Sequence, residues 1–295
     1  MDFVNVHNIT DKVQKVMAGV PDPRLRQISY SLIAHVHAFI REVQPNQTEF
    51  ENACDFLVAL GQSTGPAKNE VILLSDILGA SSLINLLNDR PDGARNHHTD
   101  AALLGPFWRA QSPQLPLGAN IARGQEAQDA TQSLHVQGTV RDAGGQPLAD
   151  AVVDVWQASP VGLYENQDSQ QPDMNLRGQF RTAATGAFHF LSVRPAGYPV
   201  PVDGPCGALL KEQNRHPYRP AHLHFMVSKP GYKVLVTQVF ADDDERLATD
   251  VTFSVADSLV GRFARQSQGA PSAFRLDFDL VLQEGDTVFP APPIP

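Results

Sequence analysis

Two histidines one residue apart, His222 and His224, are the residues of this chain best suited to chemistry. They lie in the run Arg-Pro-Ala-His-Leu-His-Phe (219–225), which is typical of a β-strand. Side chains alternate along a strand, so both imidazoles should point to the same face. Imidazole is the commonest metal ligand in proteins, so the pair could bind a metal ion. It could equally be two half-buried structural histidines, and the pair alone leaves both interpretations open.

The residues after this pair restrict the kind of metal site. The run Phe-Met-Val-Ser-Lys (225–229) has no carboxylate, whereas a cupin would place a glutamate a few residues after the pair. The two-histidine, one-carboxylate triad of iron(II) oxygenases would need a His-x-Asp or His-x-Glu, which this segment also lacks. Any further ligands must therefore come from other parts of the chain.

Two tyrosines upstream lie in segments that look like loops. Tyr164 follows a strong predicted strand, in the run Ser-Pro-Val-Gly-Leu-Tyr-Glu (159–165), and Tyr198 lies between prolines in the run 194–199. Structural tyrosines usually pack on strands with the hydroxyl reaching water. Tyrosines in loops rich in proline and glycine are more often placed for a function, so both are candidate ligands.

The order Tyr164, Tyr198, His222 and His224 resembles that of the intradiol ring-cleaving dioxygenases. The resemblance covers most of the chain from about Gln27 onward. Further segments that carry it are 73–79, 104–107, 203–205 and 215–225. Within the family, the segments 198–201 and 216–219 are more similar to the hydroxyquinol 1,2-dioxygenase subgroup than to plain catechol enzymes.

The resemblance implies one non-haem iron(III) per subunit, bound by Tyr164, Tyr198, His222 and His224. A free tyrosine has a pKa near ~10, so only a strongly Lewis-acidic ion keeps it ionised at neutral pH, and iron(III) fits. The implied reaction is cleavage of hydroxyquinol (benzene-1,2,4-triol) by O2 between its adjacent hydroxylated carbons, giving maleylacetate. The alternative within the family is a catechol or chlorocatechol 1,2-dioxygenase, giving cis,cis-muconates.

Three residues have implied catalytic roles. Arg219 matches the guanidinium that stabilises the anion of the substrate ring, although a surface arginine beside Pro220 is the plainer interpretation. Tyr198 matches the ligand that leaves on substrate binding and accepts a proton, while Tyr164 stays bound. Gln238 matches a residue near the site, and could also be a simple amide at a strand edge.

A substrate pocket is also implied by the resemblance. Its expected lining is Leu73, Asp76, Leu104, Pro106, Phe107, Val200, Pro201 and Arg219. A third ring hydroxyl needs a polar partner when it is buried, and Asp76 is the candidate. The alternative for Asp76 is an acid on the solvent face of a helix.

The first third of the chain has helical periodicity. An apolar stripe at steps of three and four runs from Ile28 to Val43, and Pro45 should end that helix. The run Thr-Glu-Phe-Glu (48–51) looks like a capping box for the next helix, on which Cys54 would be a small core residue. A further helix is expected from about residue 69 to residue 88.

Helices with apolar faces and no strands to cover need a partner surface. The resemblance implies that this segment is a dimerisation linker, which in the family often encloses a phospholipid between the subunits. We therefore expect a homodimer formed through the N-terminal helices.

The last two thirds of the chain are predicted to be β-structure. Short segments rich in β-branched and aromatic residues are separated by glycine and proline turns at 136–140, 151–156, 180–182, 188–190, 234–240 and 274–280. This pattern predicts an antiparallel β-sandwich, and the segment 138–158 resembles prealbumin-like domains. We expect a mainly β protein with α-helices, in which residues 1–100 form a helical dimerisation domain and residues 101–295 a catalytic sandwich.

Composition excludes several classes of function. The 295 residues have a formal net charge of −9, which argues against a nucleic-acid partner. The two cysteines, Cys54 and Cys206, lack CxxC spacing, so a reducing cytoplasm is expected. The first residues show no secretory signal, and no apolar stretch reaches the ~20 residues that span a bilayer. We therefore expect a cytoplasmic protein that is not integral to a membrane.

Two hypotheses outside the family fit part of the pattern. A zinc hydrolase could use His222 and His224, but it would leave Tyr164 and Tyr198 unexplained and would be colourless. A non-catalytic prealbumin-like binding module would bind no iron and would make the loop tyrosines incidental. Colour separates these hypotheses from the iron(III) site, since tyrosinate bound to iron(III) gives a red-brown protein.

Overall fold

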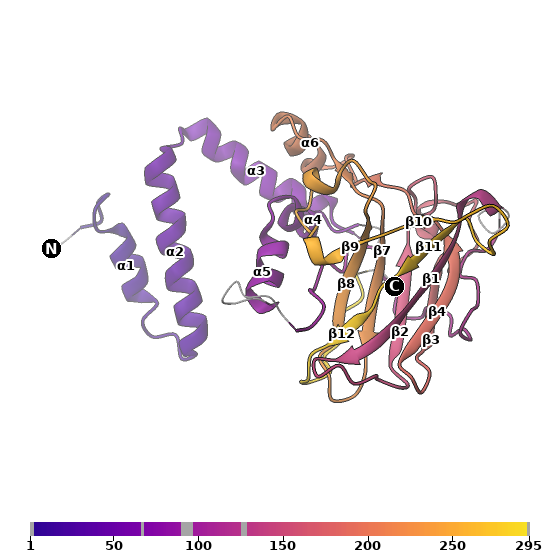
Figure 1. The fold of residues 1–295 in the computed structure, drawn as a ribbon. Helices are drawn as coiled ribbons and strands as arrows, with labels where there is room; N and C mark the ends of the chain where they lie inside the picture. Colours follow the sequence, from indigo (N-terminus) through magenta and orange to yellow (C-terminus); the bar gives the residue numbers. More distant parts are fainter. Residues whose placement is uncertain (1–2, 66–67, 90–96, 125–128, 294–295) are drawn as a thin grey trace. The chain divides into compact units, whose positions relative to one another are not determined.

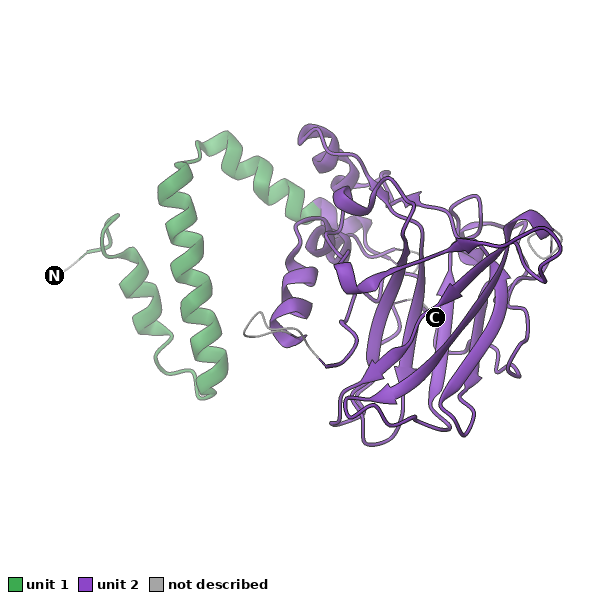
Figure 2. Ribbon diagram, viewed as in Figure 1, with its two compact units in different colours: residues 1–58 green, residues 59–295 purple. Residues whose placement is uncertain are grey.

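A computed structural model describes residues 3–65, 68–89, 97–124 and 129–293. The chain divides into two compact units, residues 1–58 and residues 59–295, which Figure 2 shows in green and purple. Helices and strands carry the labels of Figure 1.

The first unit is helical. It contains α1 (Ile9–Val16), α2 (Pro23–Val43) and the first part of α3 (Gln47–Ser63). Asp22 caps α2 by accepting a hydrogen bond from the backbone of Arg24, and Gln44, with φ 49°, ends the helix after Val43 as predicted.

The capping box of α3 lies two residues before the predicted one. The Asn46 side chain accepts from the Glu49 backbone at 3.0 Å, and the Glu49 carboxylate accepts from the Asn46 backbone at 2.9 Å. The prediction of Thr48 and Glu51 was therefore wrong. Asparagine is as good a helix cap as serine or threonine, and the chain offers it first.

Apolar side chains of the first unit are largely exposed. The predicted stripe on α2 is between 42% and 60% exposed at Ile28, Leu32, Val36, Phe39, Ile40 and Val43. Neither α1 nor α2 has a buried residue. Cys54 on α3 is exposed too, so the prediction that it is a core residue was wrong: these helices do not bury a core of their own.

After the end of α3, the second unit has two helices where one was predicted. They are α4 (Glu70–Ile77) and α5 (Ala80–Asp89), bent by 68°. Gly79 breaks the predicted helix because its φ of 71° is left-handed, a conformation that commonly ends helices. Among the described residues, no single helix is long and apolar enough to cross a membrane; α4 and α5 meet that test only as a bent pair, by length and composition.

The rest of the second unit is a β-sandwich of two sheets. The first sheet has the order β10-β11-β1-β12, with β4 also on β1, and the second has the order β3-β2-β7-β8-β9. The strands of the first sheet are β1 (Ser133–Asp142), β4 (Ala187–Val193), β10 (Ala264–Arg265), β11 (Phe274–Asp277) and β12 (Leu280–Leu282). Those of the second are β2 (Val152–Gln157), β3 (Arg177–Arg181), β7 (His222–Ser228), β8 (Leu235–Ala241) and β9 (Val260–Gly261).

The sandwich prediction is confirmed, but the sheets are mixed and not purely antiparallel. Strand β1 pairs parallel with β11 and β12, and β8 pairs parallel with β9. Parallel neighbours need long connections: residues 143–273 separate β1 from β11, and residues 242–259 separate β8 from β9. The smaller elements are α6 (Pro205–Glu212), the β5–β6 pair (Tyr198–Pro199 and Tyr218–Arg219), and short 3-10 helices at Ala130–Gln132, Glu165–Gln167, Leu247–Thr249 and Asp257–Leu259.

The predicted strand from residue 274 to residue 280 is interrupted. Its two parts, β11 and β12, keep one register along β1, but Thr139 between them donates its backbone N–H to the Asp279 carboxylate at 2.7 Å. Gly138 allows this approach: a Cβ there would lie 1.9 Å from the carbonyl oxygen of Phe278.

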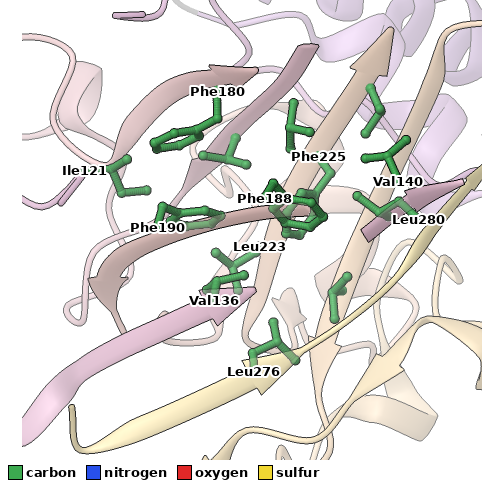
Figure 3. Close-up of a cluster of buried hydrophobic side chains, with 14 of the residues drawn as sticks. Ile121, Val136, Val140, Phe180, Phe188, Phe190, Leu223, Phe225, Leu276 and Leu280 are labelled. Carbon is green, nitrogen blue, oxygen red and sulfur yellow. The ribbon is translucent and has the colours of Figure 1, made fainter. Parts of the chain in front are cut away.

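The core lies between the two sheets (Figure 3). Alternate residues of each strand face inward, such as Leu223 and Phe225 of β7 and Phe188 and Phe190 of β4. Because the odd-numbered residues of β7 enter the core, His222 and His224 lie on the outer face of the second sheet, as the strand pattern predicts. That outer face is where the candidate site lies.

Candidate metal centre and substrate pocket

Four predicted ligands meet on the outer face of the second sheet. The hydroxyls of Tyr164 and Tyr198 are 3.3 Å apart, and the Nε2 atoms of His222 and His224 are 3.1 Å apart. The two pairs are neighbours, with ring centroids 5.5 Å apart for Tyr198 and His222 and 6.3 Å for Tyr164 and His224. All four side chains are buried.

The two imidazoles are held in place by the chain around them. The ring of His222 bonds the Pro220 carbonyl through Nδ1 at 2.7 Å, which directs Nε2 toward His224. The ring of His224 stacks on Trp156, with centroids 4.7 Å apart. Gly105 also approaches this ring: its φ is 72°, and a Cβ there would be 3.3 Å from His224 Cε1, so glycine fits this position.

Burial sets the protonation state of these groups. It lowers the pKa of His222 to about 3, with a further contribution from the charge of Arg219, and it lowers the pKa of His224 well below its usual value. Both imidazoles are therefore neutral, the form that binds metals. Burial, together with the neighbouring Tyr198, raises the pKa of Tyr164 well above its usual value, so a phenolate there needs a cation beside it.

The donor set fits a hard, strongly Lewis-acidic metal ion. Among the residues that the structure describes, no group of three or more His, Cys, Asp or Glu side chains could hold a metal, so any ion bound by His222 and His224 would need the tyrosine oxygens. Each pair of donor atoms is close enough to contact one ion. Two neutral nitrogens and two phenol oxygens are the ligands that the sequence predicts for iron(III).

Arg219 and Gln238 join this cluster. The Arg219 side chain is buried, and its Nη1 lies 3.3 Å from His222 Nε2, so the interpretation as a surface arginine was wrong. Gln238 accepts from Arg219 Nη2 at 2.8 Å and donates to the Leu103 carbonyl at 2.8 Å. Gln238 lies opposite His224 on β8 and is fully buried, so it is not a simple amide at an exposed strand edge.

A pocket opens beside the tyrosines and Arg219. It is partly open to solvent. The predicted residues that line it are Leu73, Asp76, Pro106, Phe107, Val200, Pro201 and Arg219, together with Tyr198. Leu104 does not line it: its side chain packs against the aromatic cluster that includes Trp156 and Tyr164, and its neighbours Leu103 and Gly105 face the pocket instead.

Asp76 lies in this pocket and not on a solvent face. Its side chain is buried, and burial raises its pKa, while a hydrogen bond with Ser81 and the charge of Arg219 oppose that rise. The alternative of a solvent-facing acid was therefore wrong. The pocket thus has a carboxyl group on one wall and a guanidinium on another.

Sequence reasoning missed part of the site. The unpredicted residues that line the pocket are Lys68, Asn69, Glu70, Ile72, Leu103, Gly105 and Thr252. It also missed Asp250, which bonds Arg219. The alternation Asp250, Thr252, Ser254 is typical of a side-chain-capped turn, and that signal could have drawn attention to this segment.

The sandwich, the buried tyrosine–histidine cluster and the adjoining pocket lie in two stretches of the chain that match known protein families. Residues 104–284 match the family described as "Dioxygenase", and residues 22–96 match "Catechol dioxygenase N terminus". The chain belongs to the family of intradiol ring-cleaving dioxygenases, which are oxidoreductases. A zinc hydrolase and a non-catalytic binding module are thereby ruled out.

Within this family, the chain is similar to dioxygenases named for hydroxyquinol and chlorohydroxyquinol. The chain is 40% identical over 283 residues to 6-chlorohydroxyquinol 1,2-dioxygenase of Cupriavidus pinatubonensis, covering 96% of this chain and 99% of that protein. It is 41% identical over 251 residues to hydroxyquinol 1,2-dioxygenase of Rhizobium sp., covering 84% and 82%. The crystal structure of hydroxyquinol 1,2-dioxygenase from Pseudomonas putida DLL-E4 superposes with a TM-score of 0.87 at 35% identity, covering 95% of this chain and 99% of that one.

Proposed function

We propose that this enzyme cleaves hydroxyquinol with O2 between its two adjacent hydroxylated carbons and releases maleylacetate. The observation that carries the proposal is the buried Asp76 carboxyl in the pocket that also contains Tyr198 and Arg219. When the two hydroxyls of a diol bind at the tyrosine–histidine cluster, the rest of its ring lies in this pocket. A third hydroxyl on the ring would find in Asp76 the polar partner that a buried hydroxyl requires.

One iron(III) per subunit is the proposed cofactor, held by Tyr164, Tyr198, His222 and His224. The support is the neutral, converging donor set described above. When bound, iron(III) supplies the Lewis acidity that ionises the two phenols and activates the diol toward O2. The protein's part is to orient the substrate, to accept its protons and to keep water out.

The two tyrosines have different proposed roles. Tyr198 lines the pocket, whereas Tyr164 is fully buried and stacks on Phe107, with centroids 4.4 Å apart. Tyr198 is therefore the phenolate that an incoming diol meets, and its oxygen accepts a substrate proton. A positioned base of this kind typically contributes about 10²- to 10⁴-fold in rate. Tyr164 remains a ligand throughout.

Arg219 is proposed to stabilise the negative charge that develops on the substrate ring. Its guanidinium lines the pocket beside His222, in a buried setting where a positive charge acts strongly. Gln238 connects Arg219 to His224: its side-chain nitrogen lies 3.3 Å from His224 Nδ1 while its oxygen accepts from Arg219. Gln238 thus keeps the guanidinium and the ligand in one arrangement.

The substrate is tested by comparing steady-state oxygen uptake on hydroxyquinol, catechol and a chlorocatechol, with the product identified by mass. The expected result is the highest kcat/KM for hydroxyquinol, with maleylacetate as product. A higher kcat/KM for catechol or the chlorocatechol, with a muconate as product, would assign the enzyme to that alternative.

We also propose that the enzyme is a cytoplasmic homodimer, with residues 1–100 as the dimerisation segment and residues 101–295 as the catalytic domain. The support is the exposed apolar stripe of α2, which a second copy would cover, and a phospholipid enclosed between subunits would suit such a surface. Light scattering over a range of concentrations tests the dimer, and mass spectrometry of a solvent extract tests the lipid. A stable monomer at micromolar protein would contradict the dimer.

A further inference from the structure

We propose that Asp250 is a positioning residue that orients the Arg219 guanidinium so that Nη1 faces the substrate pocket. The inference deepens the proposed function and rests on it, because it concerns how the chain aims the charge assigned to the substrate anion. The inference follows from which of the three guanidinium nitrogens already have hydrogen-bond partners in the protein.

Two of the three guanidinium nitrogens are occupied by protein acceptors. Nε donates to Asp250 Oδ1 at 3.2 Å, while Nη2 contacts Gln238 Oε1 at 2.8 Å, Ser254 Oγ at 2.5 Å and Asp250 Oδ2 at 3.3 Å. Within the described part of the chain, the contact of Nη1 is His222 Nε2 at 3.3 Å. If that nitrogen is given to a metal, Nη1 keeps both its hydrogens for a ligand in the pocket.

The Asp250 carboxylate is itself fixed by a turn. It accepts from the backbone of Thr252 at 3.3 Å and of Ser254 at 3.1 Å, and from their hydroxyls at 2.9 and 2.6 Å. Burial alone would raise the pKa of Asp250, but Arg219 and these hydrogen bonds lower it well below its usual range, so the carboxylate stays charged. A buried charge held by so many bonds has little freedom to turn, and it transfers that order to Arg219.

The same turn is tied to the pocket helices. Ser82 on α5 donates its hydroxyl to the Thr252 carbonyl at 2.8 Å, and Thr252 lines the pocket. Phe253 takes a left-handed φ of 56°, and its ring lies 3.3 Å from where a Cβ on Gly79 would be. The turn at 250–254 therefore joins the wall that carries Asp76 to the side chain of Arg219.

A merely structural ion pair would behave differently, and the chain offers two controls. Asp154 is as buried as Asp250, but its carboxylate accepts from Trp108 and Gln179 instead of an arginine of the pocket. Arg177 donates through Nε to Glu165 at 2.8 Å, a second buried pair that serves as an internal reference for Arg219.

The functional test compares Asp250→Asn with Asp154→Asn in iron-loaded, full-length enzyme. We expect Asp250→Asn to lower kcat about 10- to 100-fold with unchanged iron per subunit and little change in KM, as loss of an outer-shell partner does. Asp154→Asn should keep kcat. Ser254→Ala removes the Oγ contacts to Arg219 Nη2 and to the Asp250 carboxylate but leaves both charges in place, so it should lower kcat in the same direction by a smaller factor.

Arg219→Met provides the coupling test. If Asp250 acts through Arg219, adding Asp250→Asn to Arg219→Met should lower kcat by much less than it does in the wild type. Losses that simply multiply would overturn the proposal. So would a kcat near the wild-type value in both Asp250→Asn and Ser254→Ala, or a loss in Asp250→Asn that Asp154→Asn matches.

A second measurement separates this inference from the proposed function. In full-length protein loaded with diamagnetic gallium(III), nuclear magnetic resonance can follow hydrogen exchange at the Nε–H groups of Arg219 and Arg177. Asp250→Asn should speed exchange at Arg219 about tenfold or more and leave Arg177 unchanged. Wild-type protein that cleaves no diol would refute the proposed function alone. Unchanged exchange at Arg219 would refute the positioning role alone.

Discussion

The two faces of strand β7 have different roles: one packs in the core of the sandwich, and the other carries the histidines of the candidate site. Leu223 and Phe225 point into the sandwich, His222 and His224 point out of it, and all four side chains are almost completely buried. The inner face is covered by the other sheet, whose contribution is apolar side chains. The outer face meets the hydroxyls of Tyr164, which precedes a 3-10 helix, and of Tyr198 on the short strand β5.

This difference shows that burial alone does not distinguish residues of the hydrophobic core from residues of the candidate site. An apolar side chain on the inner face needs only the right volume and shape. A polar side chain on the outer face needs a hydrogen-bond partner for each buried polar atom. The Pro220 carbonyl and Gln238 are such partners for the two histidines, and Trp156 stacks on the ring of His224. The inner face therefore contributes mainly to stability. The outer face is organised around the proposed metal site, at which the four donor atoms meet.

The largest effect is expected from replacing one residue on each face. His224→Ala should lose iron and ring cleavage together while the protein stays folded, because its imidazole is a proposed ligand. Leu223→Ala should retain iron in the folded fraction but lower the free energy of unfolding by about 2–5 kcal/mol through the cavity it leaves. Metal analysis beside calorimetry checks both. Full iron and normal turnover in His224→Ala would contradict the ligand assignment.

The two tyrosines sharpen the comparison within the outer face. Tyr198→Phe should retain part of the iron through the other three ligands and lose about 10²- to 10⁴-fold in rate, since a proton acceptor is gone. Tyr164→Phe should abolish most of the visible band of the substrate complex. Anaerobic titration of each variant with hydroxyquinol, followed by its visible spectrum, checks this. The reverse pattern would exchange the two roles, and unchanged spectra in both would remove these residues as ligands.

Asp76 tests how the pocket discriminates between rings. Asp76→Asn should lower kcat/KM for hydroxyquinol by about 10-fold and leave that for catechol nearly unchanged, because only the triol offers a third hydroxyl. Steady-state kinetics on both substrates give the ratio. An equal loss on both would mean that Asp76 supports the fold of the pocket and not the choice of substrate.

The sequence predicts best what is local along the chain. His222 and His224 could be assigned to one face because strand periodicity is a local property, and the α2 stripe and its end at Val43 follow from helical spacing. The family resemblance added Tyr164 and Tyr198, whose loops have no periodicity to interpret. Their meeting on the outer face of the sheet depends on contacts across many residues, which only the structure displays.

Three of the errors share a physical cause. The predicted helix from residue 69 to residue 88 breaks at Gly79, a left-handed glycine against which Phe253, distant in sequence, packs. The predicted antiparallel sheets are mixed because the last strands return beside β1 in parallel. Asp250 could not be assigned to Arg219 because no spacing rule connects residues 31 positions apart. In each case a long-range contact decided what local preference left open.

The smallest effect on ring cleavage is expected at Asp154, a buried carboxyl on the outer face of the second sheet. Burial raises its pKa to about 6, although hydrogen bonds from Trp108, Gln179 and Ser112 and the charge of Arg177 oppose that rise. The folded state therefore keeps this proton to a higher pH than the unfolded state, whose pKa is near 3.8. Stability should fall as pH rises from about 4 to about 6 and then level off.

The expected size of that loss is about 3 kcal/mol, from the shift between 3.8 and about 6 at 1.36 kcal/mol per pKa unit. Asp154→Asn removes this titration and keeps an oxygen that can accept from Trp108. The stability of the variant relative to wild type should therefore increase as pH rises from 4 to 7, because only the wild type loses stability over that range. Ring cleavage should not change. Denaturant unfolding at several pH values checks this. A difference between the two proteins that is independent of pH would mean that Asp154 ionises in the folded protein as it does in water.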